Sequence, residues 1–393
     1  MIYYFIFLII ILLSYIFIKK YNLNGFFTLL CTLIILYIIS DPKHCIELTI
    51  LGCKLFFYSV FPSLFPFLIL VNMIISCGGI NIYSKILGNF ICTPLYLPKN
   101  CSLALLVSVF CGYPLGARYA TILYSEKFID FKTYERLLNI ASNGSPLFIV
   151  GAVGTSMLLN PKIGYLLLLS NMLSCMAMAF ILPNKIKPNK NFYMNKSFSN
   201  ITNNPSTNLG QSFMAAVEDA IKTSLSIGGF IVIFSVLIGI INDSVLFNTV
   251  VNKLSDMSNI PLDVLKGISL GLLELTNGCN IIAKCTLSLN NKLILISFLI
   301  GFSGISITSQ VYSIISKFNV SIKKYLFLKL TQGAISAFFT AFICKIPLLS
   351  PVLETFNTNQ YFNNINSQLY ILISMFIIIP FLAFNLKNLF KRI

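Results

Sequence analysis

Residues 142–148 read Ser-Asn-Gly-Ser-Pro-Leu-Phe and lie within an apolar run long enough to cross a bilayer. Pro146 lacks a backbone N–H and clashes with the preceding turn, and Gly144 loosens the helix just before it. A carbonyl freed in lipid costs several kcal/mol unless protein or a water-filled cavity satisfies it. The stretch therefore predicts a broken membrane helix with a small polar site at Asn143 and Ser145. A Pro-kinked helix that only packs against its neighbours is the alternative.

The composition of the whole chain is that of a polytopic membrane protein. Its 393 residues are 56% hydrophobic and 10% charged, and the mean hydropathy is +0.85. The net charge of +16 comes mostly from Lys and Arg between apolar runs, where these residues set topology and meet anionic lipid. The lipid bilayer is thus the expected partner. Nucleic acid is not expected, because the chain has no basic helix and no RNA-binding motif.

The cysteines do not suggest a metal site. The chain has 11 Cys and 1 His, and the Cys residues are scattered singly without a CxxC pair. Such residues in apolar segments are expected to be small buried hydrophobes. We therefore expect no metal, no disulfide framework and no cofactor.

Apolar length and loop charge predict an all-α polytopic membrane protein with about nine transmembrane crossings and two re-entrant hairpins. The expected crossings are 1–18, 26–40, 46–76, 137–158, 164–183, 213–242, 293–315, 325–345 and 369–386. The hairpins cover 101–125 and 264–290, although full crossings there remain open, and 126–136 and 243–263 are interpreted as loops. Lys and Arg concentrate in the segments assigned to the inner side, which places the N-terminus outside and the C-terminus in the cytoplasm.

An internal repeat is predicted by the order of these interruptions. Residues 111–116 match 275–280, and the break at 143–146 matches 302–306. Each repeat has an odd number of crossings, so the second would enter the membrane inverted. Transporters of this plan bind solute between the repeats near the midplane. The expected domains are an N-terminal helical pair (1–45), repeat 1 (46–183), a cytoplasmic Asn/Lys-rich linker (184–211), repeat 2 (212–345), and an outer loop with a C-terminal transmembrane helix (346–393).

Two ionisable side chains lie inside the predicted hairpins, Arg118 in the first and Glu274 in the second. A charge within the membrane is costly and usually faces a cavity or a partner. If the hairpin tips meet, we expect Glu274 to bind a cation or a donor group of the solute, with Arg118 as its counter-ion or as an anion contact. The alternative is that either side chain reaches the membrane interface.

Small polar side chains at the tips and breaks complete the predicted solute or ion site. The whole set is Arg118, Asn143, Ser145, Glu274, Thr276, Asn277, Ser303 and Ser306. Unwound backbone with such side chains suits Na⁺, protonated groups or hydroxyl-rich solutes. Close helix packing is the alternative, because it uses the same small residues.

One motif could mark an enzyme. Residues 301–304 have the GxSG form of intramembrane serine proteases, which need a His on a neighbouring helix to activate the Ser. The chain's one His, His44, is predicted at the outer membrane edge. Nucleotide-binding and metalloprotease motifs do not occur either, so the chain is not expected to be an enzyme.

Four motifs together resemble a known family. They are Phe61–Phe67 (FPSLFPF), Gly112–Ala117 (GYPLGA), 142–154 (SNGSPLFIVGAVG) and Glu274–Gly278 (ELTNG). The chain resembles the YlbJ-type sporulation integral membrane proteins, in the wider group that carries the nucleoside-recognition or Gate domain. The resemblance implies a cytoplasmic-membrane protein needed for spore formation. With the inverted repeat it favours a transporter for a small solute, nucleoside-like or an ion. A non-transporting protein of spore-envelope assembly is the alternative, and a homo-oligomer stays open.

Overall fold

The computed structural model describes residues 25, 27–182 and 209–345, and within these ranges every regular element is a helix. The predicted all-α class is therefore confirmed. The crossings predicted at 1–18 and 369–386, and the linker up to residue 208, lie outside the described residues. After a helix over Phe27–Ser40, the elements are α2 (Pro42–Leu55), η1 (Phe56–Val60), α3 (Phe61–Ser76), α4 (Gly79–Ile86), α5 (Gly88–Ile91), η2 (Lys99–Cys101), α6 (Ser102–Cys111), α7 (Leu115–Ser125), α8 (Phe131–Ile140), η3 (Leu147–Met157), α9 (Pro161–Ile181), α11 (Leu209–Asp243), α12 (Val245–Ser258), α13 (Leu262–Leu273), α14 (Leu275–Lys284), α15 (Leu289–Phe302), α16 (Gly304–Ile315) and α17 (Ile322–Cys344).

Four helices among the described residues are long and apolar enough to cross a membrane, or up to six if two strongly bent pairs each count as one span. The four are Pro161–Ile181, Leu209–Asp243, Leu289–Ile315 and Ile322–Cys344. They coincide with the crossings predicted at 164–183, 213–242, 293–315 and 325–345. The described part of the chain thus has the spans of a polytopic membrane protein, but fewer clear ones than the about nine crossings predicted for the full length.

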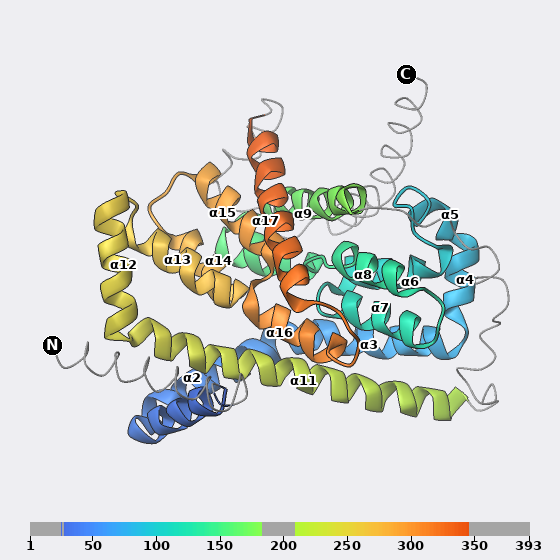
Figure 1. Cartoon of the computed structure of the whole chain (residues 1–393), viewed down its shortest axis with the longest axis horizontal. Coiled ribbons are helices and arrows are strands. Elements are labelled where there is room, and N and C mark those ends of the chain that lie inside the picture. The colour runs from blue at the N-terminus through green and yellow to red at the C-terminus, as the bar shows by residue number, and fades with distance from the viewer. Residues whose placement is uncertain (1–24, 26, 183–208, 346–393) are drawn as a thin grey trace.

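Two long helical stretches run antiparallel and form one side of the molecule. One is the continuous run α2–η1–α3 and the other is α11, of 35 residues. At one end His44 Nε2 lies 2.7 Å from Asp243 Oδ2. Toward the other end Asn72 Nδ2 donates a hydrogen bond to Asp219 Oδ2 over 2.8 Å. Figure 1 shows α2 and α3 beside α11, so residues far apart in sequence are joined along most of both stretches.

Glycine and proline shape this long pair. A Cβ on Gly52 would lie 3.0 Å from Val232 Cα, which shows that the two backbones approach closely there. Pro62 has no N–H and crowds the turn before it. That turn widens into the π-helix η1, in which the Phe61 N–H bonds to the Phe56 carbonyl.

The two interrupted segments each form a pair of helices that fold back on one another, and both predicted breaks are present. Helices α6 and α7 fold back on each other around Gly112–Pro114, and α13 and α14 do so around Glu274. Residues 141–145 lie outside any helix, between α8 and η3. Helices α15 and α16 separate at Ser303, whose φ of 72° is left-handed. The polar interruptions noted in the sequence are thus real ends of helices.

Close backbone contacts hold the second hairpin shut and pack the first hairpin against the end of α8. A Cβ on Gly278 in α14 would lie 2.1 Å from Gly271 Cα in α13. A Cβ on Gly116 in α7 would lie 2.1 Å from the carbonyl oxygen of Ala141. Any larger residue at either position would push the helices apart, because backbone atoms cannot yield as a flexible side chain can.

Two segments interpreted as loops contain helix, so these predictions were wrong. The segment 243–263 holds α12, whose N-cap Ser244 accepts a hydrogen bond from the Phe247 N–H. In the segment 126–136, α8 already begins at Phe131. Charged side chains suggested loops in both places. The Ser244 cap favours helix in α12, and burial of one face against the bundle favours it in α8.

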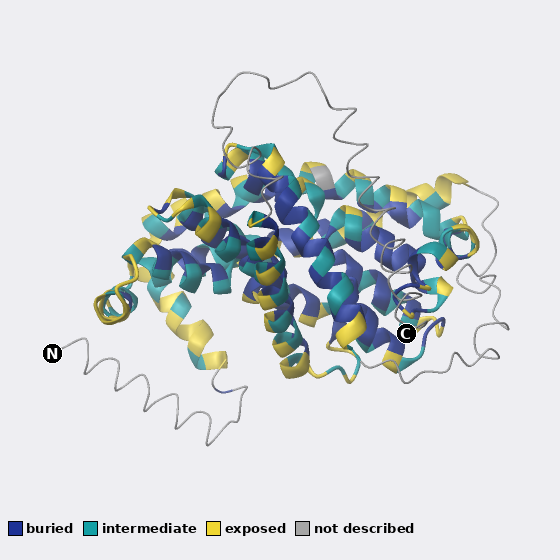
Figure 2. Ribbon diagram, turned by 90° about the horizontal axis from the view of Figure 1, so that it is seen from above, coloured by how far each residue is buried: buried dark blue, intermediate teal, exposed yellow. Residues whose placement is uncertain are grey.

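The interior divides into two apolar clusters. The first joins α3–α8 with parts of α11 and α16, and the second joins η3, α9 and α13–α15. Buried residues fill the centre of the bundle (Figure 2). Large apolar side chains are exposed on outer helix faces, among them Leu225 on α11 and Phe338 and Phe342 on α17. Such faces are suited to contact with lipid.

Candidate functional site

Each hairpin tip packs against the break in the next broken helix along the chain. At the first tip, the Tyr113 N–H donates to the Asn143 carbonyl over 2.8 Å. This bond satisfies a carbonyl that the break has freed. In the second half, a Cβ on Gly304 would lie 3.3 Å from the Leu275 nitrogen. Tip and break therefore form one polar unit in each half.

A cavity of about 300 Å³ lies where both tips, both breaks and the α3–α11 pair meet. Its polar lining comes from Tyr113, Ser145, Ser156, Glu274, Thr276, Ser306 and Gln310. Most of the remaining wall is apolar, including Phe67, Phe148 and Ile231. Four predicted site residues line the cavity, namely Ser145, Glu274, Thr276 and Ser306. An apolar chamber with a few converging polar groups is the usual form of a small-molecule site.

Glu274 is the one charged residue among the described residues that line this cavity. It ends α13 and caps α14: its carboxylate accepts the Thr276 and Asn277 N–H groups, each over 2.8 Å. A carboxylate is stable at a helix N-terminus because it pairs with the free N–H groups there. The same carboxylate keeps lone pairs for a ligand, and its side chain is only partly buried. Glu274 is thus held rigidly at the cavity wall.

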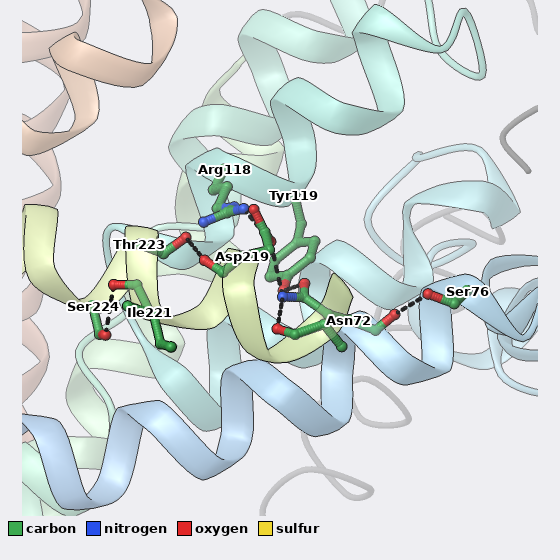
Figure 3. A network of polar contacts seen from close by, with 9 residues as sticks. Asn72, Ser76, Arg118, Tyr119, Asp219, Ile221, Thr223 and Ser224 are labelled. Carbon is green, nitrogen blue, oxygen red and sulfur yellow. Dashed lines mark hydrogen bonds and ion pairs between the residues drawn. The ribbon is translucent and has the colours of Figure 1, made fainter. Parts of the chain in front are cut away.

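Arg118 does not pair with Glu274, so the predicted pair is wrong. Its Nη2 lies 2.5 Å from Asp219 Oδ2 on α11. Asn72 Nδ2 donates to the same oxygen, and Tyr119 Oη donates to Asn72 Oδ1 over 2.8 Å. Figure 3 shows this network joining α3, α7 and α11. Arg118 sits in the first turn of α7, beyond the tip, and its side chain reaches the long helix pair and not the cavity.

The other predicted residues lie around the breaks but do not line the cavity. Asn143 is buried and its Nδ2 lies 3.2 Å from Ser108 Oγ. Ser303 is fully buried, and its hydroxyl has no hydrogen-bond partner among the described residues. Asn277 contributes its backbone N–H to Glu274. These three residues thus belong to the tips and breaks but not to the cavity wall.

The sequence reasoning missed Lys329, which lies within the apolar helix α17 and has 0% exposure. Its Nζ donates to the Ser142 carbonyl over 3.2 Å, to Ser142 Oγ over 3.1 Å and to Gln332 Oε1 over 2.8 Å. The ammonium also lies 5.7 Å from the centre of the Tyr113 ring. The signal was available, because an ionisable residue inside a membrane span marks a functional position.

The cavity has the form of a small-molecule site, and within the described ranges His44 and Ser303 lie in different parts of the fold. His44 contacts Asp243 at the end of the long helix pair, whereas Ser303 is buried at the second break. The cavity offers hydroxyl and amide groups, one fixed carboxylate and an apolar wall. It therefore suits a solute with a donor or cationic group and an apolar face.

A comparison with curated proteins finds a relative named "Sporulation integral membrane protein YlbJ" from Bacillus subtilis (strain 168). The two are 27% identical over an alignment of 344 residues, which covers 82% of this chain and 84% of the relative. No family model matches the chain, and no solved structure matches it.

Proposed function

We propose that this chain is a YlbJ-type sporulation integral membrane protein and acts as a permease that moves a small solute across the cell membrane during spore formation. The observation that carries the proposal is the cavity of about 300 Å³ between the two hairpin tips and the two breaks. Transporters built from broken helices bind their solutes at such a junction, because unwound backbone supplies polar groups in the middle of the membrane.

We further propose that residues 46–183 and 212–345 are inverted repeats. The order of elements supports this: a long helix, a short helical segment, a hairpin, a broken helix and a final helix occur in each half. The antiparallel α2–α3 and α11 fit a two-fold axis in the membrane plane. Such repeats can alternate access to a shared site by moving against one another, as in an elevator-like core.

The lining suggests the class of solute. Glu274 is a fixed carboxylate, and no Lys or Arg lines the cavity in the described part of the chain. A solute with a cationic or hydrogen-bond-donating group is therefore favoured, which includes a nucleoside-like molecule or an ion. Phe67 and Phe148 provide an apolar or aromatic surface for the rest of it.

Replacing Glu274 by Gln is expected to weaken solute binding by about 10- to 100-fold, the cost of losing one charge-assisted hydrogen bond. The measurement is a thermal-shift and uptake panel in nanodiscs and proteoliposomes, with uridine, adenosine, lysine, putrescine and inorganic cations as probes. One class of probe should stabilise the wild type and be taken up by it.

Lys284→Gln is the matched control, because Lys284 is exposed near the end of the same helix α14. Its binding should equal that of the wild type. Equal losses in both variants would contradict the role of Glu274. No binding and no uptake for any probe, together with stable capture of spore-envelope proteins, would favour the non-transporting alternative.

We propose an orientation with the N-terminus outside and the C-terminus in the cytoplasm, on the strength of the Lys and Arg distribution. A Ser206→Cys variant, with Cys31 and Cys77 replaced by Ser, should resist a membrane-impermeant maleimide in intact cells. A Ser258→Cys variant in the same background should react with it. The opposite pattern would reverse the orientation.

A further inference from the structure

The first break exposes a carbonyl that the helix itself cannot satisfy. In a continuous helix the Ser142 carbonyl would accept the N–H of residue 146. That residue is Pro146, which has no N–H. The carbonyl must find donors elsewhere, because an unpaired one in a dry interior is costly.

The nitrogen donors come from the other half of the chain, beside Cys175 Sγ of the first half at 3.8 Å. Lys329 Nζ and Gln332 Nε2, both on α17, lie 3.2 Å and 3.3 Å from the Ser142 carbonyl oxygen. Residues 142 and 329 are 187 positions apart. The first broken helix is thus tied to the last described helix through its unwound turn.

The Lys329 ammonium donates its hydrogen bonds to neutral oxygens. An ammonium has three donors, and here they match three acceptors: the Ser142 carbonyl, Ser142 Oγ and Gln332 Oε1. No carboxylate pairs with Lys329 among the described residues. A buried charge without a counter-charge persists only where such dipoles replace the lost water.

We propose that the break at Ser142 is a monovalent-cation site that the chain fills with its own Lys329 ammonium. A backbone carbonyl, a hydroxyl and an amide oxygen around one point are the ligands that unwound membrane helices use for Na⁺. The tethered cation removes the need for a free one at this position. It lies 5.7 Å from the centre of the ring of Tyr113, a residue that lines the cavity. This inference holds whichever solute enters the cavity.

Emptying the site should make it accept a free ion. Lys329→Ala removes the ammonium and leaves the oxygens and a space. The variant should gain, over the wild type, a rise in melting temperature of about 4 °C when NaCl replaces choline chloride at equal ionic strength. The measurement is thermal unfolding in nanodiscs followed by circular dichroism.

Two controls define the result. Lys329→Met fills the space without a charge and should gain no Na⁺ response. Lys324→Ala removes an exposed lysine near the start of the same helix and should also behave as the wild type. A Lys329→Ala protein that unfolds at the same temperature in Na⁺, K⁺, Li⁺ and choline would overturn the proposal.

Lys329→Gln decides the matter if Lys329→Ala yields no folded protein. The amide fills much of the same volume and can donate to the Ser142 carbonyl, but it carries no charge. If the site needs a cation, Lys329→Gln should have a melting temperature well below those of the wild type and of Lys324→Gln. If Lys329→Gln melts with the wild type, the charge is unnecessary and the proposal fails.

Discussion

A Gly278→Val variant is expected to lose about 3 kcal/mol of unfolding free energy, the upper end of the usual cost of overpacking. The Cβ would lie 2.1 Å from Gly271 Cα and 3.0 Å from the Gly267 carbonyl oxygen. Both obstacles are backbone atoms of α13, so the hairpin must open. Its tip carries Glu274, and solute binding should fall together with stability. Thermal unfolding in nanodiscs measures the first effect and the uptake panel the second.

Gly229→Val is the matched control, since a Cβ there meets nothing within 4 Å. Gly229 is an exposed helix position on α11. The Gly229→Val variant should lose little stability. Because the added side chain meets no neighbour, the substitution changes only the helix propensity. Equal melting temperatures for the two variants would mean that α13 and α14 do not pack as closely as the structure has them.

An Asp219→Ala variant is expected to lose about 2 kcal/mol, the value of a charged hydrogen-bond group with partial solvent screening. The carboxylate accepts from Arg118 and Asn72 together. Its removal leaves the Arg118 guanidinium, whose side chain is 18% exposed, without its ion-pair partner. Melting temperature in nanodiscs is again the measurement, and the link between α7 and α11 should loosen.

The neighbouring Glu218→Ala variant is the control. It removes the same charge from the same helix, and Glu218 is exposed. It should melt close to the wild type. A double variant, Arg118→Leu with Asp219→Leu, should recover much of the loss, because it leaves no charge unpaired. A double variant less stable than Asp219→Ala would show that the ion pair is not the source of the effect.

The breaks and hairpin tips were predictable because their causes are local. Pro146 removes a donor from its own turn, and the polar run at Glu274 interrupts an apolar helix at its own position. Both effects can be identified from a few adjacent residues. Ser145 and Thr276, which these local signals place at a break and at a tip, line the cavity between the halves.

The partners of the charged residues could not be predicted in the same way. Arg118 and Asp219 are 101 residues apart, and their contact depends on how α7 is rotated against α11. Lys329 was not predicted as a site residue, because the lysines of the chain were interpreted only as markers of topology. Its role depends on a carbonyl freed 187 residues earlier. Sequence spacing carries no information on such contacts without the fold.

The antiparallel pairing of α2–α3 with α11 also sets a delay during synthesis. Asp219, the hydrogen-bond partner of Asn72, is added to the chain 147 residues after Asn72. At ordinary elongation rates this takes about 7–30 s. Throughout that time the close-packing face around Gly52 has no partner helix. The first half is therefore the part of the newborn chain that the cell must shield longest from aggregation.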